Sequence, residues 1–120
     1  MTIETRYIFT AAMDVEPDKE ALFDDLYDNE HIPLLRQVPG VIAVARFKRE
    51  QEFQMVMGGE RLTLTLDDEP RQSAIYELAS PDVLLSDAWA KAVDSGRWPD
   101  DIRPFTSNRR PTLRRRIYPA

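Results

Sequence analysis

Two predicted strands of this chain are apolar on both of their faces, and this feature most restricts its fold. The strand at residues 6–13 places Tyr7 and Phe9 on one face and Ile8 and Ala12 on the other. The strand at residues 41–47 has the same double apolar character. A strand of this kind must be covered on both sides, so the fold has to supply two covering layers.

The order of the predicted elements identifies the layer on one side. Strands, helices and a hairpin follow each other as strand 6–13, helix 17–38, strand 41–47, hairpin 53–66, strand 73–78, helix 80–95 and strand 113–118. Without the hairpin, an insertion at about residues 52–66 with its turn at Gly58–Gly59, this order is βαββαβ. We therefore predict the α+β ferredoxin-like fold, a four-stranded antiparallel sheet with both helices on one face.

The second layer is expected to come from another copy of the chain. Two helices cover only one face of such a sheet, which leaves the other apolar face without a cover. A second subunit is the simplest cover, because identical faces can meet across a twofold axis. We expect a homodimer that forms through the open face of the sheet.

The first predicted helix has an irregular apolar stripe. At about 100° per residue, the stripe consists of Phe23, Leu26, Tyr27, Leu34 and Val38. Glu30 falls in its middle and His31 on its shoulder. Pro33 removes one helical hydrogen bond and is expected to kink the helix. The predicted stripe of the second helix is Leu85, Ala88, Trp89 and Ala92, and residues 97–111 are predicted to form a loop.

Composition limits the classes of function. We expect residues 1–120 to form one domain. The absence of cysteine excludes disulfides and thiolate sites, and the net charge of −5 disfavours nucleic-acid binding. No apolar run approaches the roughly 20 residues that cross a membrane. The first residues do not resemble a secretory signal, so we expect a cytoplasmic protein.

Charge is distributed unevenly along the chain. Residues 1–30 contain nine acids and two bases, whereas residues 103–118 contain six arginines and no acid. One interpretation is that these two ends meet in the fold and neutralise each other. The alternative is that the arginine-rich segment forms an anion-binding face.

Three segments resemble a known family. Residues 27–33 (YDNEHIP), followed by residues 38–41 (VPGV), are similar to the helix-one signature of the EthD-like branch of the dimeric α+β barrel superfamily. Residues 75–82 (IYELASPD) resemble the strand-into-helix segment of the same group. The resemblance implies a homodimer whose two sheets close into one barrel, with a small-molecule cleft between sheet and helices. The hairpin and the arginine-rich segment depart from the family pattern.

Three residues of the first helix are candidates for catalysis. His31, the only histidine, titrates near neutrality and is the natural general base or acid, although it can also be structural or, as a lone histidine, a haem ligand. Glu30, a carboxylate in an apolar stripe, should have a raised pKa unless a cation meets it, and Arg115 is its expected partner. Tyr27 shares a helical turn with both residues.

Four other residues are candidates for substrate binding. Arg115 on the last strand can hold a carboxylate or an enolate. Tyr7 and Tyr76 are on strands, and Trp98 is in a proline-bounded loop where it either lines a ligand mouth or packs the tail onto the body. One histidine without cysteine makes a poor zinc site, and we expect neither a metal nor an organic cofactor.

The sequence supports two hypotheses for function. In the first, the protein is a cofactor-independent isomerase, cyclase or monooxygenase that acts on a small apolar or aromatic carbonyl, phenol or lactone compound. His31 moves a proton, Glu30 or Tyr27 orients it, and an arginine stabilises the oxyanion. In the second, the protein is a non-catalytic ligand-binding or accessory protein of a catabolic pathway. The fold does not choose between them.

Overall fold

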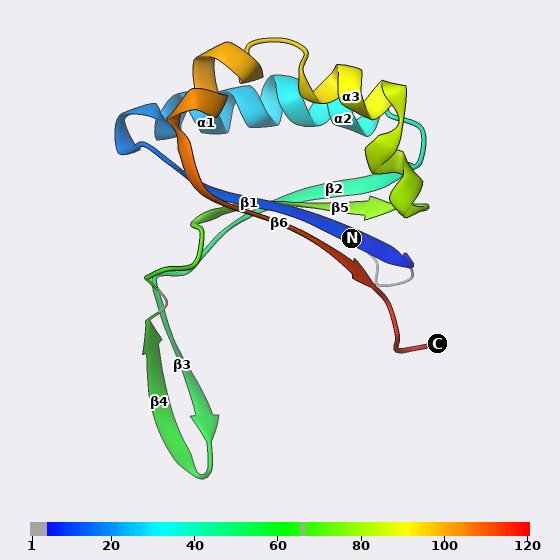
Figure 1. Ribbon diagram of the computed structural model, residues 1–120. Coiled ribbons are helices and arrows are strands. Elements are labelled where there is room, and N and C mark those ends of the chain that lie inside the picture. Colours follow the sequence, from blue (N-terminus) through cyan, green and yellow to red (C-terminus); the bar gives the residue numbers. More distant parts are fainter. Residues whose placement is uncertain (1–4, 66) are drawn as a thin grey trace.

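A four-stranded antiparallel sheet carries the helices on one of its faces (Figure 1). The structure is a computed structural model, and it describes residues 5–65 and 67–120. The strands are β1 (Tyr7–Val15), β2 (Val41–Lys48), β5 (Gln72–Leu78) and β6 (Thr106–Arg115), in the order β2-β5-β1-β6. This is the predicted ferredoxin-like arrangement, with β5 and β1 in the centre and β2 and β6 at the edges.

The helical layer consists of several short pieces. A single-turn 3₁₀ segment, Pro17–Lys19, leads into α1 (Glu20–Leu26), and a wider π-helical turn, Tyr27–His31, joins α1 to α2 (Ile32–Arg36). The second layer element begins with the 3₁₀ segment Pro81–Leu85, continues as α3 (Asp87–Val93), and is followed by the turns Trp98–Ile102 and Arg103–Phe105. None of the helices in the described part of the chain is long and apolar enough to cross a lipid bilayer.

The π-helical turn corrects the predicted stripe of the first helix. In this turn the N–H of Ile32 donates to the carbonyl of Tyr27, five residues earlier, so each later side chain lies one position behind its α-helical place. Leu35 is buried where Leu34 was predicted, and His31 is buried where Glu30 was predicted. The predicted irregularity before Pro33 is therefore present, but it is a wide turn that changes which side chains face the core.

The second helix is interrupted, contrary to the prediction. Ser86 has extended backbone with ψ of 152°, and its hydroxyl accepts a hydrogen bond from the Trp89 N–H at 3.1 Å. The serine thus ends one helical segment and caps the next. As a result Leu85 is 84% exposed and does not belong to the buried stripe.

The tail also differs from the prediction. Instead of a loop over residues 97–111, two helical turns lead into β6, which begins at Thr106. Pro111 lies inside this strand opposite Ala11. A proline cannot donate to a ladder, but β6 is an edge strand that pairs only with β1, so no second ladder is lost.

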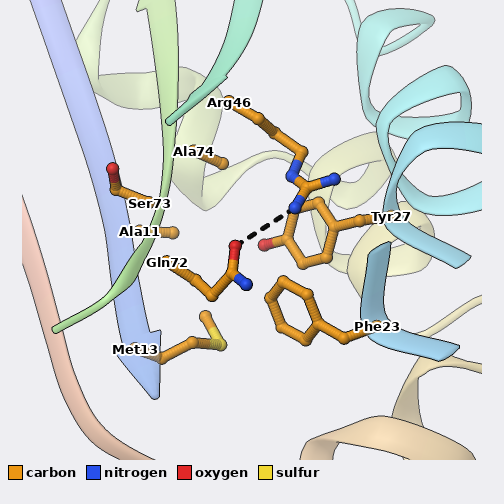
Figure 2. Close-up of a pocket in the computed structure, with 8 residues that line it drawn as sticks. All are labelled: Ala11, Met13, Phe23, Tyr27, Arg46, Gln72, Ser73 and Ala74. Atoms are coloured by element: carbon orange, nitrogen blue, oxygen red, sulfur yellow. Dashed lines mark hydrogen bonds between the residues drawn. The ribbon is translucent and has the colours of Figure 1, made fainter. Parts of the chain in front are cut away.

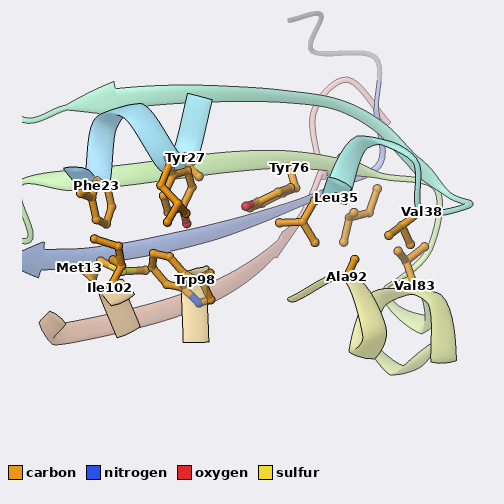
Figure 3. Close-up of a cluster of buried hydrophobic side chains, with 13 residues drawn as sticks. Met13, Phe23, Tyr27, Leu35, Val38, Tyr76, Val83, Ala92, Trp98 and Ile102 are labelled. Atoms are coloured by element: carbon orange, nitrogen blue, oxygen red, sulfur yellow. The ribbon is translucent and has the colours of Figure 1, made fainter. Parts of the chain in front are cut away.

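The hydrophobic core fills the space between the helical layer and the sheet (Figure 3). From the sheet, β1 and β5 contribute side chains that point toward the helical layer, which are Met13, Ala74, Tyr76 and Leu78. The helical layer contributes the remaining buried apolar side chains, which are Phe23, Leu26, Tyr27, Leu35, Val38, Val83, Ala92, Trp98 and Ile102. All of these residues are at most 8% exposed, so the helical layer buries this side of the sheet.

Within the described residues, no helix lies over the opposite face of the sheet (Figure 1). By strand register this face carries the apolar residues Ile8, Ala12, Ala45, Phe47 and Ile75, of which Phe47 is 50% exposed. It also carries polar residues, namely Thr10, Ser73, Glu77, Arg110, Thr112 and Arg114. The predicted apolar character is therefore present in the strands β1, β2 and β5, but it is interrupted by Glu77 and gives way to arginines along β6.

A hairpin, here called the arm, projects away from the sheet on the side opposite the helices (Figure 1). It consists of β3 (Glu52–Met57) and β4 (Glu60–Thr65), which pair only with each other. Its turn contains Gly58 and Gly59 with φ of 62° and 78°, a backbone that favours glycine at both positions. Leu66, predicted as the end of the hairpin, lies outside the described residues.

Candidate functional site

A cavity of about 220 Å³ lies between the sheet and the helical layer. Its floor comes from β1 and β5, and its walls come from the first helix, α3 and the tail. The lining residues are mostly aromatic or apolar, with two arginines and one histidine: Phe9, Ala11, Met13, Tyr27, His31, Leu35, Tyr76, Trp89, Val93, Trp98, Arg103 and Arg109. An apolar chamber with a few convergent polar groups is the usual form of a ligand site.

His31 is directed into this cavity by the π-helical turn. It is 4% exposed, and its ring stacks on Trp98 with centroids 4.7 Å apart and packs edge-on against Tyr27 at 4.9 Å. Its Nδ1 atom is buried and has no hydrogen-bond partner among the described residues. A buried polar atom without a partner is uncommon in proteins and needs an explanation.

The surroundings of His31 favour the neutral imidazole. Burial lowers its pKa to about 4, and the nearby positive charge of Arg103 acts in the same direction. The carboxylate of Glu30 opposes this shift only weakly, as the smallest of the three effects. At neutral pH the ring is therefore uncharged, and one of its nitrogens is available to accept a proton or a hydrogen bond.

Two tyrosines form the floor beside His31. Tyr27 is 2% exposed and Tyr76 is 1% exposed, and the Tyr76 hydroxyl points toward Tyr27 (Figure 3). Burial raises the pKa of Tyr27 to about 12 and raises the pKa of Tyr76 well above its usual value. Both phenols therefore keep their protons and can act as hydrogen-bond donors, but not as bases.

Trp98 is held in place by the contact between Glu30 and the chain just before the tryptophan. The Glu30 carboxylate accepts from the Arg97 backbone N–H at 2.7 Å and from its Nε at 2.9 Å. Gly96, with φ of 71°, leaves room for this contact, because a Cβ atom there would collide with the Glu30 carboxylate. Trp98 itself is 5% exposed, so it lines the cavity and also packs the tail onto the body.

Two arginines of the tail provide positive charge at the cavity. The guanidinium of Arg103 donates to the Val93 carbonyl at 3.1 Å and to the Asp94 carboxylate at 2.6 Å. Nε of Arg109 donates to the Thr106 hydroxyl at 2.9 Å, and Nη2 of Arg109 donates to the backbone carbonyl of Arg103, also at 2.9 Å. Sequence reasoning did not single out either residue, although both belong to the arginine-rich segment.

Three of the predicted site residues do not line the cavity. Glu30 is paired with Arg97 and not with Arg115, and these contacts lower its pKa, whereas the sequence predicted a buried acid. Arg115 instead lines a separate hollow with Arg6 and Arg116. Tyr7 pairs with Arg115 across the strands and packs at the edge of the core. The structure thus brings together Tyr27, His31, Tyr76 and Trp98.

A polar cluster lies on the other side of Tyr27 (Figure 2). Arg46 of β2 reaches toward the first helix and donates to Asp24 at 2.6 Å, to Gln72 at 3.1 Å and to Asp28. Its guanidinium also lies 5.4 Å from the centre of the Tyr27 ring, within the range of cation–π attraction. All of these groups are paired, and the hollow between them has essentially no free volume.

The charges of the N-terminal third do not neutralise the tail as one interpretation predicted. Within the described residues, Asp24 and Asp28 pair with Arg46, Glu20 pairs with Arg71, and Glu30 pairs with Arg97. These three bases all precede residue 103. Among the described residues, no group of three or more His, Cys, Asp or Glu side chains is placed to hold a metal ion.

Comparison with known proteins supports the fold. The chain is similar in structure to an EthD family protein from Bacillus halodurans, with a TM-score of 0.56 and 14% sequence identity over 92% of this chain and 99% of that one. No family model matches the sequence, and no curated protein matches it. The fold is therefore EthD-like, as the resemblance of its sequence segments implied.

Proposed function

We propose that the cavity binds a small apolar or aromatic molecule that carries a carbonyl, phenol or lactone oxygen, and that His31 exchanges a proton with it. The observation that carries this proposal is that His31 lines the cavity and that its buried Nδ1 atom has no hydrogen-bond partner among the described residues. A bound ligand would supply the missing partner. The stacked rings around the cavity suit a flat, apolar body.

The charges around the cavity support an anionic or enolisable ligand. Arg103 and Arg109 are positioned to stabilise a negative charge that develops on the ligand oxygen. A ligand anion would cancel the effect of Arg103 on His31 and raise the pKa of the imidazole from about 4. Transfer of a proton from the ligand to His31 would then leave an enolate or phenolate between two cations, with Tyr27 as a hydrogen-bond donor. Glu30 is committed to Arg97 and takes no part.

A non-catalytic role is the second candidate. His31 is only 4% exposed, and the cavity that it lines is bounded mainly by aromatic and apolar side chains. A protein that merely stores or presents a ligand to an enzyme would need such a cavity but no proton transfer. Such an accessory protein of a catabolic pathway would bind the same class of molecule in the same cavity.

We also propose that the protein is a cytoplasmic homodimer whose two sheets meet through their open faces. The support is the set of apolar side chains on that face, which includes Ile8 and Ile75 in the two central strands. Burial of such side chains stabilises association by about 25 cal/mol per Å² of apolar surface. Sedimentation velocity at micromolar concentration tests this part of the proposal, and a monomer would contradict it.

The binding proposal is tested with the purified protein and a small aromatic carboxylate, benzoate. Both tryptophans line the cavity, so their fluorescence reports occupancy. We expect Arg109→Met to weaken benzoate binding by about tenfold, since a charge-assisted contact contributes about 1.5–3 kcal/mol. The matched control is Arg36→Met, an exposed arginine outside the cavity. Equal binding by both variants would contradict the proposal.

Proton transfer is tested separately from binding. Calorimetric titration in two buffers of different ionisation enthalpy measures the protons taken up with the ligand. We expect uptake by the wild-type chain at mildly acidic pH and none by His31→Gln. Mass spectrometry of molecules that co-purify with the protein then identifies the natural ligand. Turnover of that ligand by the wild type but not by His31→Gln supports the enzyme, and binding without turnover supports the accessory protein.

A further inference from the structure

We infer that the arm, β3 with β4, packs against strand β6 of a second copy of the chain. This inference rests on the proposed homodimer and adds to it a contact outside the sheet faces. The arm of one subunit would contact β6 of its partner, and by twofold symmetry the partner's arm would contact β6 of the first subunit.

One side of the arm is an exposed apolar stripe. Phe53 lies opposite Leu64 and Met55 lies opposite Leu62, so these side chains share one face, together with Met57. Phe53 and Met55 are each 41% exposed, and Met57 is 59% exposed. A two-stranded hairpin is marginally stable by itself in water, so an arm of this composition needs a surface to cover its stripe.

The covering surface does not come from the arm's own subunit. The strands β3 and β4 form a separate two-stranded sheet, and the arm extends away from the helices, past the open face of the four-stranded sheet (Figure 1). An object that docks on this open face therefore comes within reach of the arm. The proposed second subunit is that object.

Charge complementarity identifies the part of the partner that the arm meets. Residues 50–69 contain six acids and one base, whereas residues 103–118 contain six arginines and no acid. Glu52 and Glu60 of the arm form no ion pair within the described residues, and neither do Arg114 and Arg115 of β6.

These two sets of charges are separated within one subunit. The arm and the C-terminal end of β6 lie at opposite sides of the molecule in Figure 1. Within the described residues, the ion pair between residues 50–69 and β6 lies at the base of the arm, where a carboxylate oxygen of Glu69 is 3.2 Å from Nη1 of Arg110. A partner's β6 would bring further arginines to the remaining acids and an edge strand to the stripe.

The first experiment removes the stripe. Sedimentation velocity over a dilution series gives the dimer dissociation constant of the full chain and of the double variant Met55→Ser/Met57→Ser. We expect the constant to rise at least about tenfold, because each methionine loses apolar burial in the dimer. The matched control is Val56→Ser, which changes an apolar side chain on the opposite face of the arm and is expected to change the constant less than about twofold.

The second experiment tests the charges. Glu60 lies opposite Met57 and so shares the face of the stripe, and Arg114 lies opposite Ile8 and so shares the open face of the sheet. Reversal of the arm acid in Glu60→Arg, and separately of the strand arginine in Arg114→Glu, is expected to weaken the dimer. The chain that carries both changes should regain most of the affinity, because opposite charges face each other again. A purely local role of the arm would give no such rescue.

The outcomes separate this inference from the proposed homodimer. A wild-type chain that is monomeric at micromolar concentration overturns both. A wild-type dimer whose dissociation constant is unchanged by loss of the stripe overturns the arm contact alone, as does a double charge variant, Glu60→Arg/Arg114→Glu, without rescue. Because the arm makes a separate sheet, circular dichroism and the melting temperature of each variant confirm that the body of the protein remains folded.

Discussion

The two sides of the Tyr27 ring differ in how completely their polar groups are paired. On one side, Arg46 donates to Asp24, Asp28 and Gln72 in a cluster without free volume. On the other side, His31 lines a cavity of about 220 Å³, and its buried Nδ1 atom has no hydrogen-bond partner among the described residues. Both sides belong to one helix, yet only the second has an unmet interaction and space for a ligand.

This difference indicates that one side of the helix stabilises the fold and that the other side is available to bind a ligand. A filled cluster of ion pairs fixes the helix to β2 and positions Tyr27, and changes there should affect stability. The unpaired imidazole of His31 lowers the stability of the free protein, and it gains a hydrogen bond only when a ligand binds. Substitutions on the paired side should therefore change stability, and substitutions on the cavity side should change ligand binding.

The largest expected effect is on the paired side. Arg46→Met should lower the free energy of unfolding by about 2–3 kcal/mol, because it removes an arginine side chain that is only 15% exposed and that donates to Asp24, Asp28 and Gln72. Urea unfolding measures the change. Arg71→Met is the matched control: its guanidinium is 49% exposed and pairs with Glu20, so we expect a loss of less than about 1 kcal/mol. Equal losses would remove the distinction between the sites.

The next effect is the pH dependence of stability on the cavity side. The pKa of His31 is lowered to about 4 from its usual 6.5, so the folded state binds this proton less well than the unfolded state. The associated stability is present above pH 6.5 and is lost progressively as the pH falls from 6.5 through about 4, with a total of about 3 kcal/mol. His31→Gln should lose less stability over this interval. If the free energy of unfolding changed with pH in the same way for the wild type and for His31→Gln, His31 would not titrate as described.

A smaller effect is expected for the same variant at neutral pH. His31→Gln should change the free energy of unfolding by less than about 1 kcal/mol, because the neutral imidazole has no Nδ1 hydrogen bond to lose and only its ring packing changes. Thermal unfolding near pH 7 measures this. A loss as large as that of Arg46→Met would assign His31 a structural role and weaken the catalytic proposal.

The smallest effect concerns the contact that holds Trp98. Glu30→Gln should lower the melting temperature only slightly, because its partner Arg97 is exposed and glutamine still accepts from the Arg97 N–H. The pKa of Glu30 is lowered by these contacts, so the wild-type advantage is present at neutral pH and disappears as the pH falls through the titration of this carboxyl. A marked loss of tryptophan-reported ligand binding in Glu30→Gln would show that Glu30 does more than hold the chain.

The sequence alone determined the fold and the surroundings of the site, because these depend on periodic apolar patterns and on turn residues. Alternating apolar side chains defined the strands, Gly58–Gly59 defined the arm's turn, and the order of elements indicated the ferredoxin-like sheet. The same patterns singled out Tyr27, His31, Tyr76 and Trp98, all of which line the cavity.

Only the tertiary structure decided which polar groups meet. One π-helical turn before Pro33 rotated Glu30 out of the core and His31 into it, a shift of one position that a regular helical wheel cannot represent. The partners of Glu30 and the cavity arginines, Arg103 and Arg109, come from a tail that folds back over the sheet. Such contacts depend on chain reversal over dozens of residues, and sequence periodicity carries information only about neighbours along one element.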